Sequence, residues 1–332
     1  MSAPLLTVTD LRKHFAVGGG FLGSGAQIVR ALDGVSFAIA RGEVLGLVGE
    51  SGSGKTTVGK TVLRLLDPTS GRIEFAGEDI TRLSRHALRP VRRHMQLVFQ
   101  DPFASLNPRQ TVGQILSLPL RVHEPKLGRA VRRERVQAIL ELVGLPPSHA
   151  ERFPHEFSGG QRQRIGIARA LVVEPELLVA DEPVSALDVS IQAQIVNLLL
   201  AVQARMALTI LFITHDLAVV GHVADRVAVM YLGRIVELAP TRTLFQRPRH
   251  PYTEALFQAA PIPDPTLRRA RPGLKGELPS PLNPPSGCVF RTRCPYALPL
   301  CAETPPPLRQ VGSGHSSACI RDDLSLVPAV AT

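Results

Sequence analysis

The stretch that most constrains this chain is GESGSGKT, residues 49–56, which matches the pattern G-x4-G-K-[ST] in full. The apolar run VLGLV precedes it, and the amphipathic pattern KTTVGKTVLRLL overlaps its end and continues from it. Its glycines are Gly49, Gly52 and Gly54. Glycine permits backbone angles that let a loop wrap an anion with its N–H groups, and a following helix points its positive end at the same anion. The stretch therefore predicts a strand, a phosphate-binding loop and a helix, in which Lys55 reaches the β- and γ-phosphates of a nucleotide and Thr56 offers its hydroxyl to Mg²⁺.

A second segment, LLVADEP at 177–183, supplies the carboxylates that such a site needs. Asp181 closes an apolar run that is typical of a buried strand, and Glu182 follows at once. A carboxylate at the end of a neighbouring strand binds Mg²⁺ directly or through water. We therefore predict that Asp181 is a magnesium ligand and that Glu182 accepts a proton from an attacking water.

Strands alternate with helices through much of the chain. The runs at 5–10 and 35–40 alternate as strands do, and the runs at 177–180 and 210–213 are apolar like buried strands. The pattern at 189–207 between the last two is helical. This alternation predicts an α/β fold with a parallel sheet.

Three regions depart from that alternation. The glycine-rich stretch at 16–27 predicts a loop between the first two strands. From about 101 to 164, charged helical patterns replace the strand-like runs, which predicts an inserted helical subdomain. After about residue 250 prolines become frequent, which predicts a separate extension with little regular structure.

The net charge of +10 allows a nucleic acid, an anionic membrane surface or a phosphate-rich ligand as partner. Only 5% of the residues are aromatic, and the arginines are scattered, so no stacking platform for bases is indicated. No run of 18 or more apolar residues occurs that could span a membrane. We therefore expect no nucleic-acid partner, and a surface that lies against anionic lipid headgroups explains the charge.

Further motifs occur in a fixed order around the first two. VFQDP contains Gln100, FSGGQRQRIGIARAL contains SGGQ at 158–161, SALD spans 185–188, and ITHD contains His215. Together they resemble the ATP-binding cassette (ABC) ATPases, where such segments are called the Q-loop, the signature, the D-loop and the switch histidine. One departure is Phe157, which stands where the family more usually has leucine.

The resemblance implies a fold and a role for each motif. The expected fold is a RecA-like P-loop NTPase cassette at 1–250, with an N-terminal antiparallel β subdomain, a helical subdomain at about 101–164 and a proline-rich extension at 251–332. Two cassettes would face each other head to tail with two ATP molecules between them. The residues that would bind ATP are Phe15, Gly49, Glu50, Ser51, Gly52, Ser53, Gly54, Lys55, Thr56, Thr57 and Asp181 of one cassette, with Ser158, Gly159, Gly160, Gln161 and Asp188 in the signature and D-loop.

Within that set the resemblance implies specific functions. Phe15 would stack on adenine, the alternative being an ordinary core or surface phenylalanine. The catalytic residues would be Glu182 as general base, His215 at the γ-phosphate, and Gln100, which would sense Mg²⁺ and the attacking water. Thr56, Gln100 and Asp181 would hold Mg²⁺.

The segments HPYTEAL and GELPSPLNPPSGCVFRTRCP narrow the resemblance to the F-type ATPase subunit of oligopeptide and dipeptide permeases. It implies a motor for peptide uptake at the cytoplasmic face of the inner membrane. Its partners would be a second ATPase subunit in a heterodimer, two transmembrane permease subunits and an extracytoplasmic peptide-binding protein. An apolar groove in the helical subdomain would meet the permease. Nickel, sugars or glutathione are alternative cargoes, and a regulatory or repair ATPase is the alternative function.

All four cysteines lie near the end of the chain, spaced Cys288-x5-Cys294-x6-Cys301-x17-Cys319. Two disulfides, a zinc site, an iron–sulfur cluster and unligated thiols are the alternatives. Zinc sites usually show C-x2-4-C pairs, which are absent here, whereas four thiolates suit a [4Fe–4S] cluster with looser spacing. The resemblance also favours the cluster, which would hold together a segment that has few periodic apolar residues.

Overall fold

The computed structural model describes residues 3–18, 27–101, 105–259 and 276–327, and the chain forms two compact units. The first comprises residues 1–6, 39–44 and 75–213, and the second comprises 7–38, 45–74 and 214–332. Each unit is thus assembled from segments far apart in the sequence. Three parts of the predicted regions lie outside the described residues: 19–26 of the glycine-rich loop, 102–104 of the helical subdomain and the prolines of PIPDP in the extension.

The first unit is built on three parallel strands in the order β8-β7-β6. They are β6 (Met95–Val98), β7 (Leu177–Asp181) and β8 (Thr209–Thr214). Every residue of β7 and β8 is buried, which explains their unbroken apolar sequences. Helix α6 (Gly159–Leu171) packs against β6 and against α7 (Val189–Met206). The predicted parallel strands and the predicted helix at 189–207 are confirmed.

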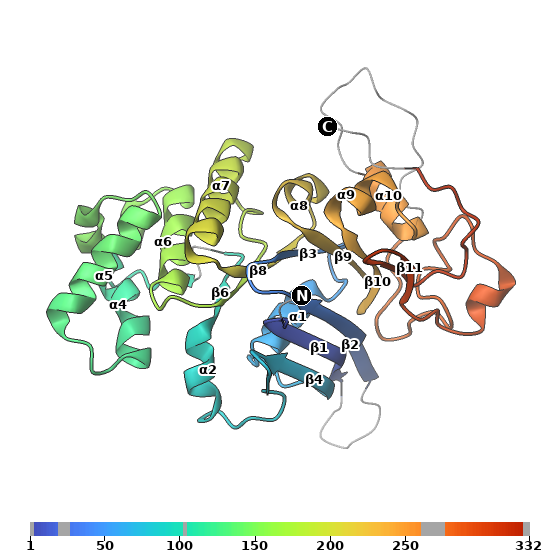
Figure 1. Ribbon diagram of the computed structural model, residues 1–332, viewed down its shortest axis with the longest axis horizontal. Coiled ribbons are helices and arrows are strands. Elements are labelled where there is room, and N and C mark those ends of the chain that lie inside the picture. Colours follow the sequence, from blue (N-terminus) through green and yellow to red (C-terminus); the bar gives the residue numbers. More distant parts are fainter. Residues whose placement is uncertain (1–2, 19–26, 102–104, 260–275, 328–332) are drawn as a thin grey trace. The chain divides into compact units, whose positions relative to one another are not determined.

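The helical region of this unit is formed by α4 (Val112–His123), α5 (Arg129–Leu142) and α6, which pack on one another (Figure 1). Helix α4 begins at a capping box: the Gln114 backbone N–H donates to the Thr111 hydroxyl, and the Thr111 backbone N–H donates to the Gln114 side-chain oxygen. The unit also contains β5 (Glu78–Asp79), α2 (Leu88–His94), η1 (Pro147–Glu151) and η2 (Pro154–Glu156). These helices confirm the inserted helical segment.

The second unit contains two groups of strands. Strands β2 (Gln27–Ile39), β1 (Leu6–Val17) and β4 (Ser70–Phe75) are neighbours in that order and form the N-terminal β subdomain. The second group has the order β11-β12-β10-β9-β3. Its strands are β3 (Val44–Val48), β9 (Arg226–Tyr231), β10 (Arg234–Pro240), β11 (Arg309–Gly312) and β12 (His315–Ser317). Among the pairings described for this group, only that of β3 with β9 is parallel. The pairs β9–β10, β10–β12 and β12–β11 are all antiparallel.

The helices of the second unit are α1 (Lys55–Val62), α8 (Leu217–Val223), α9 (Thr241–Gln246), α10 (Pro251–Ala259) and η4 (Pro299–Ala302). Figure 1 shows the end of the chain, in orange and red, lying beside β10, to which β12 is hydrogen-bonded. The expectation that the extension would have little regular structure was therefore partly wrong. Strands β11 and β12 are only four and three residues long, too short for an alternating pattern to be recognised.

The first two strands are also longer than predicted and run into the glycine-rich stretch. The C-terminal half of β1, residues 12–17, is half-buried or exposed. Its sequence therefore does not alternate between apolar and polar residues as a strand with one buried face would.

Candidate nucleotide site

The phosphate-binding loop follows β3, and two of its glycines are required by close backbone approaches. Gly54 has a φ of 104°, and a Cβ there would lie 2.5 Å from the carbonyl oxygen of Ala31 in β2. A Cβ on Gly49 would lie 2.1 Å from the carbonyl oxygen of Met230 in β9. Neither position has room for a side chain, so these glycines let the loop lie directly against β2 and β9.

Lys55 is buried at the start of α1 and is folded into the loop. Its ammonium donates to the carbonyl oxygens of Gly49 (2.7 Å) and Glu50 (2.9 Å) and to the Ser53 hydroxyl (3.4 Å). Thr56 and Thr57 occupy the first turn of α1, and both are half-buried. The structure thus places a cation and the N-terminal end of a helix at one loop, the combination that an anionic phosphate requires.

Glu50 connects this loop to the cysteine-containing end of the chain. Its carboxylate forms a two-pronged ion pair with Arg293, with nitrogen–oxygen distances of 2.6 and 3.1 Å. Hydrogen bonding to Glu50 raises the pKa of Arg293 above its usual value. The backbone N–H of Glu50 donates to the Tyr252 hydroxyl at 2.9 Å. Sequence reasoning missed both Arg293 and Tyr252, because contacts over such chain separations leave no local pattern.

Three aromatic rings form a buried cluster beside this ion pair. The ring centroids of Tyr231, Tyr252 and Phe290 lie between 4.6 and 5.3 Å apart, and all three rings are almost fully buried. Tyr231 belongs to β9, Tyr252 to α10 and Phe290 to the cysteine segment. The cluster therefore fixes that segment to the strand and the helix that support the loop.

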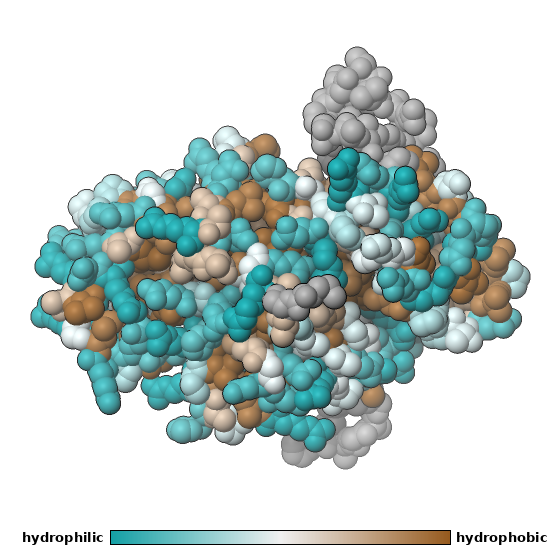
Figure 2. Space-filling view, viewed as in Figure 1, coloured by the Kyte–Doolittle hydropathy of each residue, from teal (hydrophilic) through white to brown (hydrophobic). Residues whose placement is uncertain are grey.

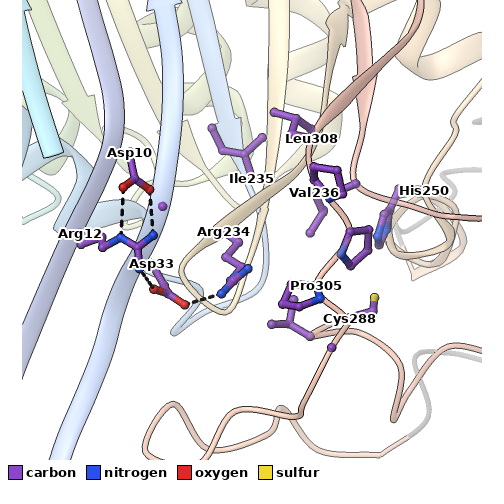
Figure 3. Close-up of a pocket in the computed structure, with 16 residues that line it drawn as sticks. Asp10, Arg12, Asp33, Arg234, Ile235, Val236, His250, Cys288, Pro305 and Leu308 are labelled. Carbon is purple, nitrogen blue, oxygen red and sulfur yellow. Dashed lines mark hydrogen bonds and ion pairs between the residues drawn. The ribbon is translucent and has the colours of Figure 1, made fainter. Parts of the chain in front are cut away.

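A pocket of about 200 Å³ in the same unit is lined by strand residues and by the extension (Figure 3). Asp33 pairs with Arg12 at 3.2 Å and with Arg234 at 2.6 Å, and Arg12 also pairs with Asp10 at 3.0 Å. Because these charges compensate one another, the pocket wall presents no net charge to a ligand. Cys288 also lines this pocket, so the cysteine segment is packed onto the β-sheet of the second unit.

The cysteines are free thiols, so the disulfide alternative is not realised. Burial raises the pKa of Cys288 and Cys319, and raises that of Cys294 to about 11. Backbone N–H groups donate to the sulfurs of Cys301 and Cys319 at 3.4 Å. Within the described ranges, no three His, Cys, Asp or Glu side chains are grouped as metal ligands. The arrangement is therefore not a ready-made metal site.

Two further predicted residues lie in the second unit. Phe15 is half-buried in β1, and the ammonium of Lys13 lies 4.9 Å from its ring centroid. His215 is exposed and stands just after β8. Asp216 beside it caps α8 by accepting from the N–H groups of Ala218 and Val219.

In the first unit, β7 presents the predicted acidic pair at its end. Asp181 is its last residue and is buried, and Glu182 follows with a φ of 46°, an uncommon conformation for a residue with a side chain. The Gln100 amide nitrogen donates to the Glu182 carboxylate at 2.8 Å. The structure therefore brings together two of the three predicted catalytic residues, Gln100 and Glu182, within one unit.

The signature segment forms the start of α6. Ser158 and Gln161 form a capping box. The Gln161 backbone N–H donates to the Ser158 hydroxyl at 3.4 Å, and the Ser158 backbone N–H donates to the Gln161 side-chain oxygen at 3.1 Å. Gly159 and Gly160 form the first turn, where backbone N–H groups have no partner within the helix. Asp188 occupies the equivalent N-cap position of α7 without a side-chain hydrogen bond to that helix. The segment is thus the N-terminus of a 13-residue helix.

The helical region also contains a groove between α4, α5 and η1, of about 490 Å³. Its lining includes Arg121, Arg129, Arg132 and Arg133. Figure 2 shows hydrophilic residues over much of this region on the face in view. This groove is basic, although Val136 and Ala150 also line it, and the apolar groove that the sequence resemblance implied stays a prediction.

Two family models match the chain. The ABC transporter model matches residues 32–185, and that of the oligopeptide/dipeptide transporter C-terminal region matches residues 236–301. A Brucella ovis protein named as a peptide import ATP-binding protein is 59% identical over 322 residues, which cover 97% of this chain and 99% of that protein. The chain belongs to the ABC transporter ATP-binding proteins. The predicted family is therefore confirmed.

Other members of the family extend the comparison. The oligopeptide transport ATP-binding protein AppF of Bacillus subtilis is 53% identical over 318 residues, covering 95% of this chain and 96% of that one. The ATP-binding cassette MJ0796, solved as a dimer bound to ADP and Pi, is similar with a TM-score of 0.64 and 29% identity, over 71% of this chain and 99% of that one. The predicted cassette fold is confirmed, and this ABC protein is an ATP-hydrolysing transporter subunit.

Proposed function

We propose that this ABC ATPase drives the uptake of dipeptides or oligopeptides by hydrolysing ATP. The observation that carries the proposal is the buried lysine loop at 49–56, in a chain whose C-terminal segment matches the oligopeptide/dipeptide transporter model. The names of the relatives support peptides over nickel, sugars or glutathione as the cargo. A regulatory or repair ATPase has no comparable support.

The residue roles that we propose follow the chemistry of each side chain. Lys55 and the N–H groups of its loop bind the phosphates, and Phe15 stacks on the adenine. Glu182 accepts the proton of the attacking water, with Gln100 orienting that water and Glu182 through its amide. His215 contacts the γ-phosphate. Phosphoryl transfer depends mainly on positioning and charge neutralisation, which these groups provide.

We propose that Mg²⁺ is held by Thr56, Gln100 and Asp181. Hydroxyl, amide and carboxylate oxygens are the hard ligands that this ion prefers. When bound, Mg²⁺ neutralises charge that develops on the phosphates. Mutation of Asp181 to Asn should therefore raise the Mg²⁺ concentration needed for half-maximal ATPase activity.

We propose that the signature residues Ser158, Gly159, Gly160 and Gln161, with Asp188, complete the ATP site of a second cassette. The helix N-terminus at Gly159 suits a γ-phosphate for the same electrostatic reason as the loop does. The partners would be a second ATPase subunit, two permease subunits and an extracytoplasmic peptide-binding protein. Among the described residues no helix is both long and apolar enough to cross a membrane. We place the protein at the cytoplasmic face of the inner membrane through these permeases.

The test of the function is reconstitution of the full chain with its permease subunits, second ATPase and binding protein in vesicles. We expect ATP-dependent uptake of labelled di- or oligopeptides and none with Lys55→Ala in this subunit. Uptake of labelled nickel, sugar or glutathione in place of peptides would overturn the proposal that peptides are the cargo. Failure of the chain to copurify with any permease subunit would overturn the proposed role in transport.

We further propose that Cys288, Cys294, Cys301 and Cys319 bind a [4Fe–4S] cluster, with zinc as the alternative. Support comes from their position in a single segment and from the N–H groups that donate to the sulfurs, since such bonds tune cluster thiolates. Binding would have to draw the thiols closer together than they lie here. Iron and labile sulfide measured in anaerobically purified protein test this, and zinc alone or no metal would overturn it.

A further inference from the structure

The phosphate-binding loop contains a carboxylate, Glu50, whose negative charge is an unfavourable neighbour for the phosphates of a nucleoside triphosphate. Like charges a few ångströms apart repel, most strongly where water is partly excluded. The Lys55 ammonium donates to the backbone carbonyl oxygen of Glu50, at 2.9 Å. Arg293 neutralises the carboxylate through two nitrogen–oxygen contacts at 2.6 and 3.1 Å.

Glu50 is held at three chemically different points. Arg293 holds the carboxylate, the Tyr252 hydroxyl accepts from the backbone N–H at 2.9 Å, and Lys55 donates to the carbonyl oxygen at 2.9 Å. A displacement of Glu50 therefore changes the surroundings of the Lys55 ammonium. Contacts made by the C-terminal extension thus reach the lysine through one residue of the loop.

Arg293 is buried and held by several contacts besides its pair with Glu50. Only 5% of its side chain is exposed. Its guanidinium also lies 3.4 Å from the Tyr231 hydroxyl, and its backbone N–H donates to the Phe290 carbonyl at 3.0 Å. Phe290 in turn is packed against Tyr231 and Tyr252. A two-pronged arginine–carboxylate pair on such a rigid base fixes orientation as well as charge.

We propose that Arg293 is a positioning residue for nucleotide binding, which neutralises Glu50 and holds it so that Lys55 and the loop N–H groups face the phosphates. This rests on the proposed role of the loop in binding ATP. The cysteine-containing extension would then contribute a residue, Arg293, to nucleotide binding. The extension then influences how tightly this subunit binds ATP.

The experiment measures the affinity of the full chain for a fluorescent ATP analogue, with unlabelled ATP and ADP as competitors. We expect Arg293→Gln to bind ATP about tenfold more weakly, because Glu50 is left unpaired beside the phosphates. The loss should be smaller for ADP, which carries less charge. The matched control is Arg291→Gln, since Arg291 is half-buried in the same segment and its guanidinium donates to Ser286 rather than to a residue of the loop. This control should bind like the wild type.

A double-mutant cycle with Glu50→Gln separates positioning from simple support of the fold. If Arg293 acts through Glu50, then Arg293→Gln should change ATP affinity by less than about twofold when Glu50 is already Gln. An equal loss in both backgrounds, or an Arg293→Gln affinity equal to that of the control, overturns the proposal.

Two further outcomes are distinguishable from these. Should Arg293→Gln melt well below Arg291→Gln, the Arg293→Lys variant decides. It keeps the charge but not the two-pronged geometry, and binding of ATP intermediate between wild type and Arg293→Gln supports the proposal, whereas full loss overturns it. A wild-type chain that binds neither ATP nor ADP would instead overturn the proposed function itself.

Discussion

The phosphate-binding loop and the signature segment differ in where their support comes from. In the loop, Glu50 is held by Tyr252 and Arg293, which stand 202 and 243 positions further along the chain. In the signature, Ser158 is held by Gln161, three positions away. Both regions contain a helix N-terminus, to which we have assigned a phosphate. A helix N-terminus can thus be held in place by a neighbouring residue or by residues from the far end of the chain. Only the first arrangement leaves a short sequence motif that can be recognised.

The largest expected effect is on ATP hydrolysis, in a variant that leaves the contacts of both the loop and the signature unchanged. Glu182→Gln removes the carboxylate that we propose as proton acceptor but keeps a side chain of the same shape beside Gln100. We expect ATPase turnover to fall about a thousandfold, within the range of a lost general base. Affinity for ATP should stay near that of the wild type. Steady-state ATPase rates and the binding of an ATP analogue check this.

The matched control is Glu174→Gln, an exposed carboxylate in the same unit. Its turnover should equal that of the wild type. If Glu182→Gln also retains its turnover, Glu182 is not the general base.

The same comparison explains how far the sequence could be read. Gly49 to Thr57, Asp181, Glu182 and the signature lie in contiguous patterns that can be read from the sequence. The hydrogen bond from Gln100 to Glu182 was not predicted. Strands β11 and β12 and the ion pair of Glu50 with Arg293 were not predicted. They depend on packing of the extension onto β10, and such contacts have no period or spacing that a single sequence reveals.

The next largest effect should come from breaking the distant support at its buried anchor, Glu237 in β10. Its carboxylate accepts from the backbone N–H groups of Arg249 and His250 and from the Thr253 hydroxyl, and it lies 2.7 Å from the ring nitrogen of His315 in β12. Glu237→Ala leaves these groups without a partner. We expect the free energy of unfolding of the second unit to fall by about 3 kcal/mol, as for other broken buried pairs.

Thermal unfolding and ATP affinity should change together in Glu237→Ala, because the extension holds the loop. Glu303→Ala, which removes an exposed carboxylate of the extension, is the control and should change neither. A destabilised Glu237→Ala that binds ATP with wild-type affinity would mean that the loop does not depend on the extension.

A smaller effect depends on pH and again belongs to the second unit. Burial lowers the pKa of His250 from its ordinary value of 6.5 to about 3. Between those values the unfolded chain binds a proton that the folded chain does not, so stability is full above pH 6.5 and falls as the pH drops towards 3. This group should therefore cost about 2 kcal/mol of stability at pH 5 relative to pH 7.5.

Melting temperatures measured across that range in wild type, His250→Gln and His86→Gln test this. The His250 variant should lose the part of the pH dependence between 6.5 and 5 that the wild type shows. His86 is exposed, and its variant should keep the wild-type slope. Equal slopes in all three proteins would contradict the assignment to His250.

The smallest expected effect concerns the locally supported region. Ser158→Ala removes the acceptor for the Gln161 N–H and should lower the free energy of unfolding by about 1 kcal/mol, the usual value of a helix cap. Ser158→Asp supplies another cap acceptor and should restore the melting temperature. Yet its carboxylate would oppose the γ-phosphate that we assign to this helix N-terminus. ATPase activity in the assembled transporter should therefore be lower in Ser158→Asp than in Ser158→Ala, although the aspartate variant is the more stable. If activity follows stability instead, Ser158 serves only as a cap, and the signature differs from the loop in function as well as in support.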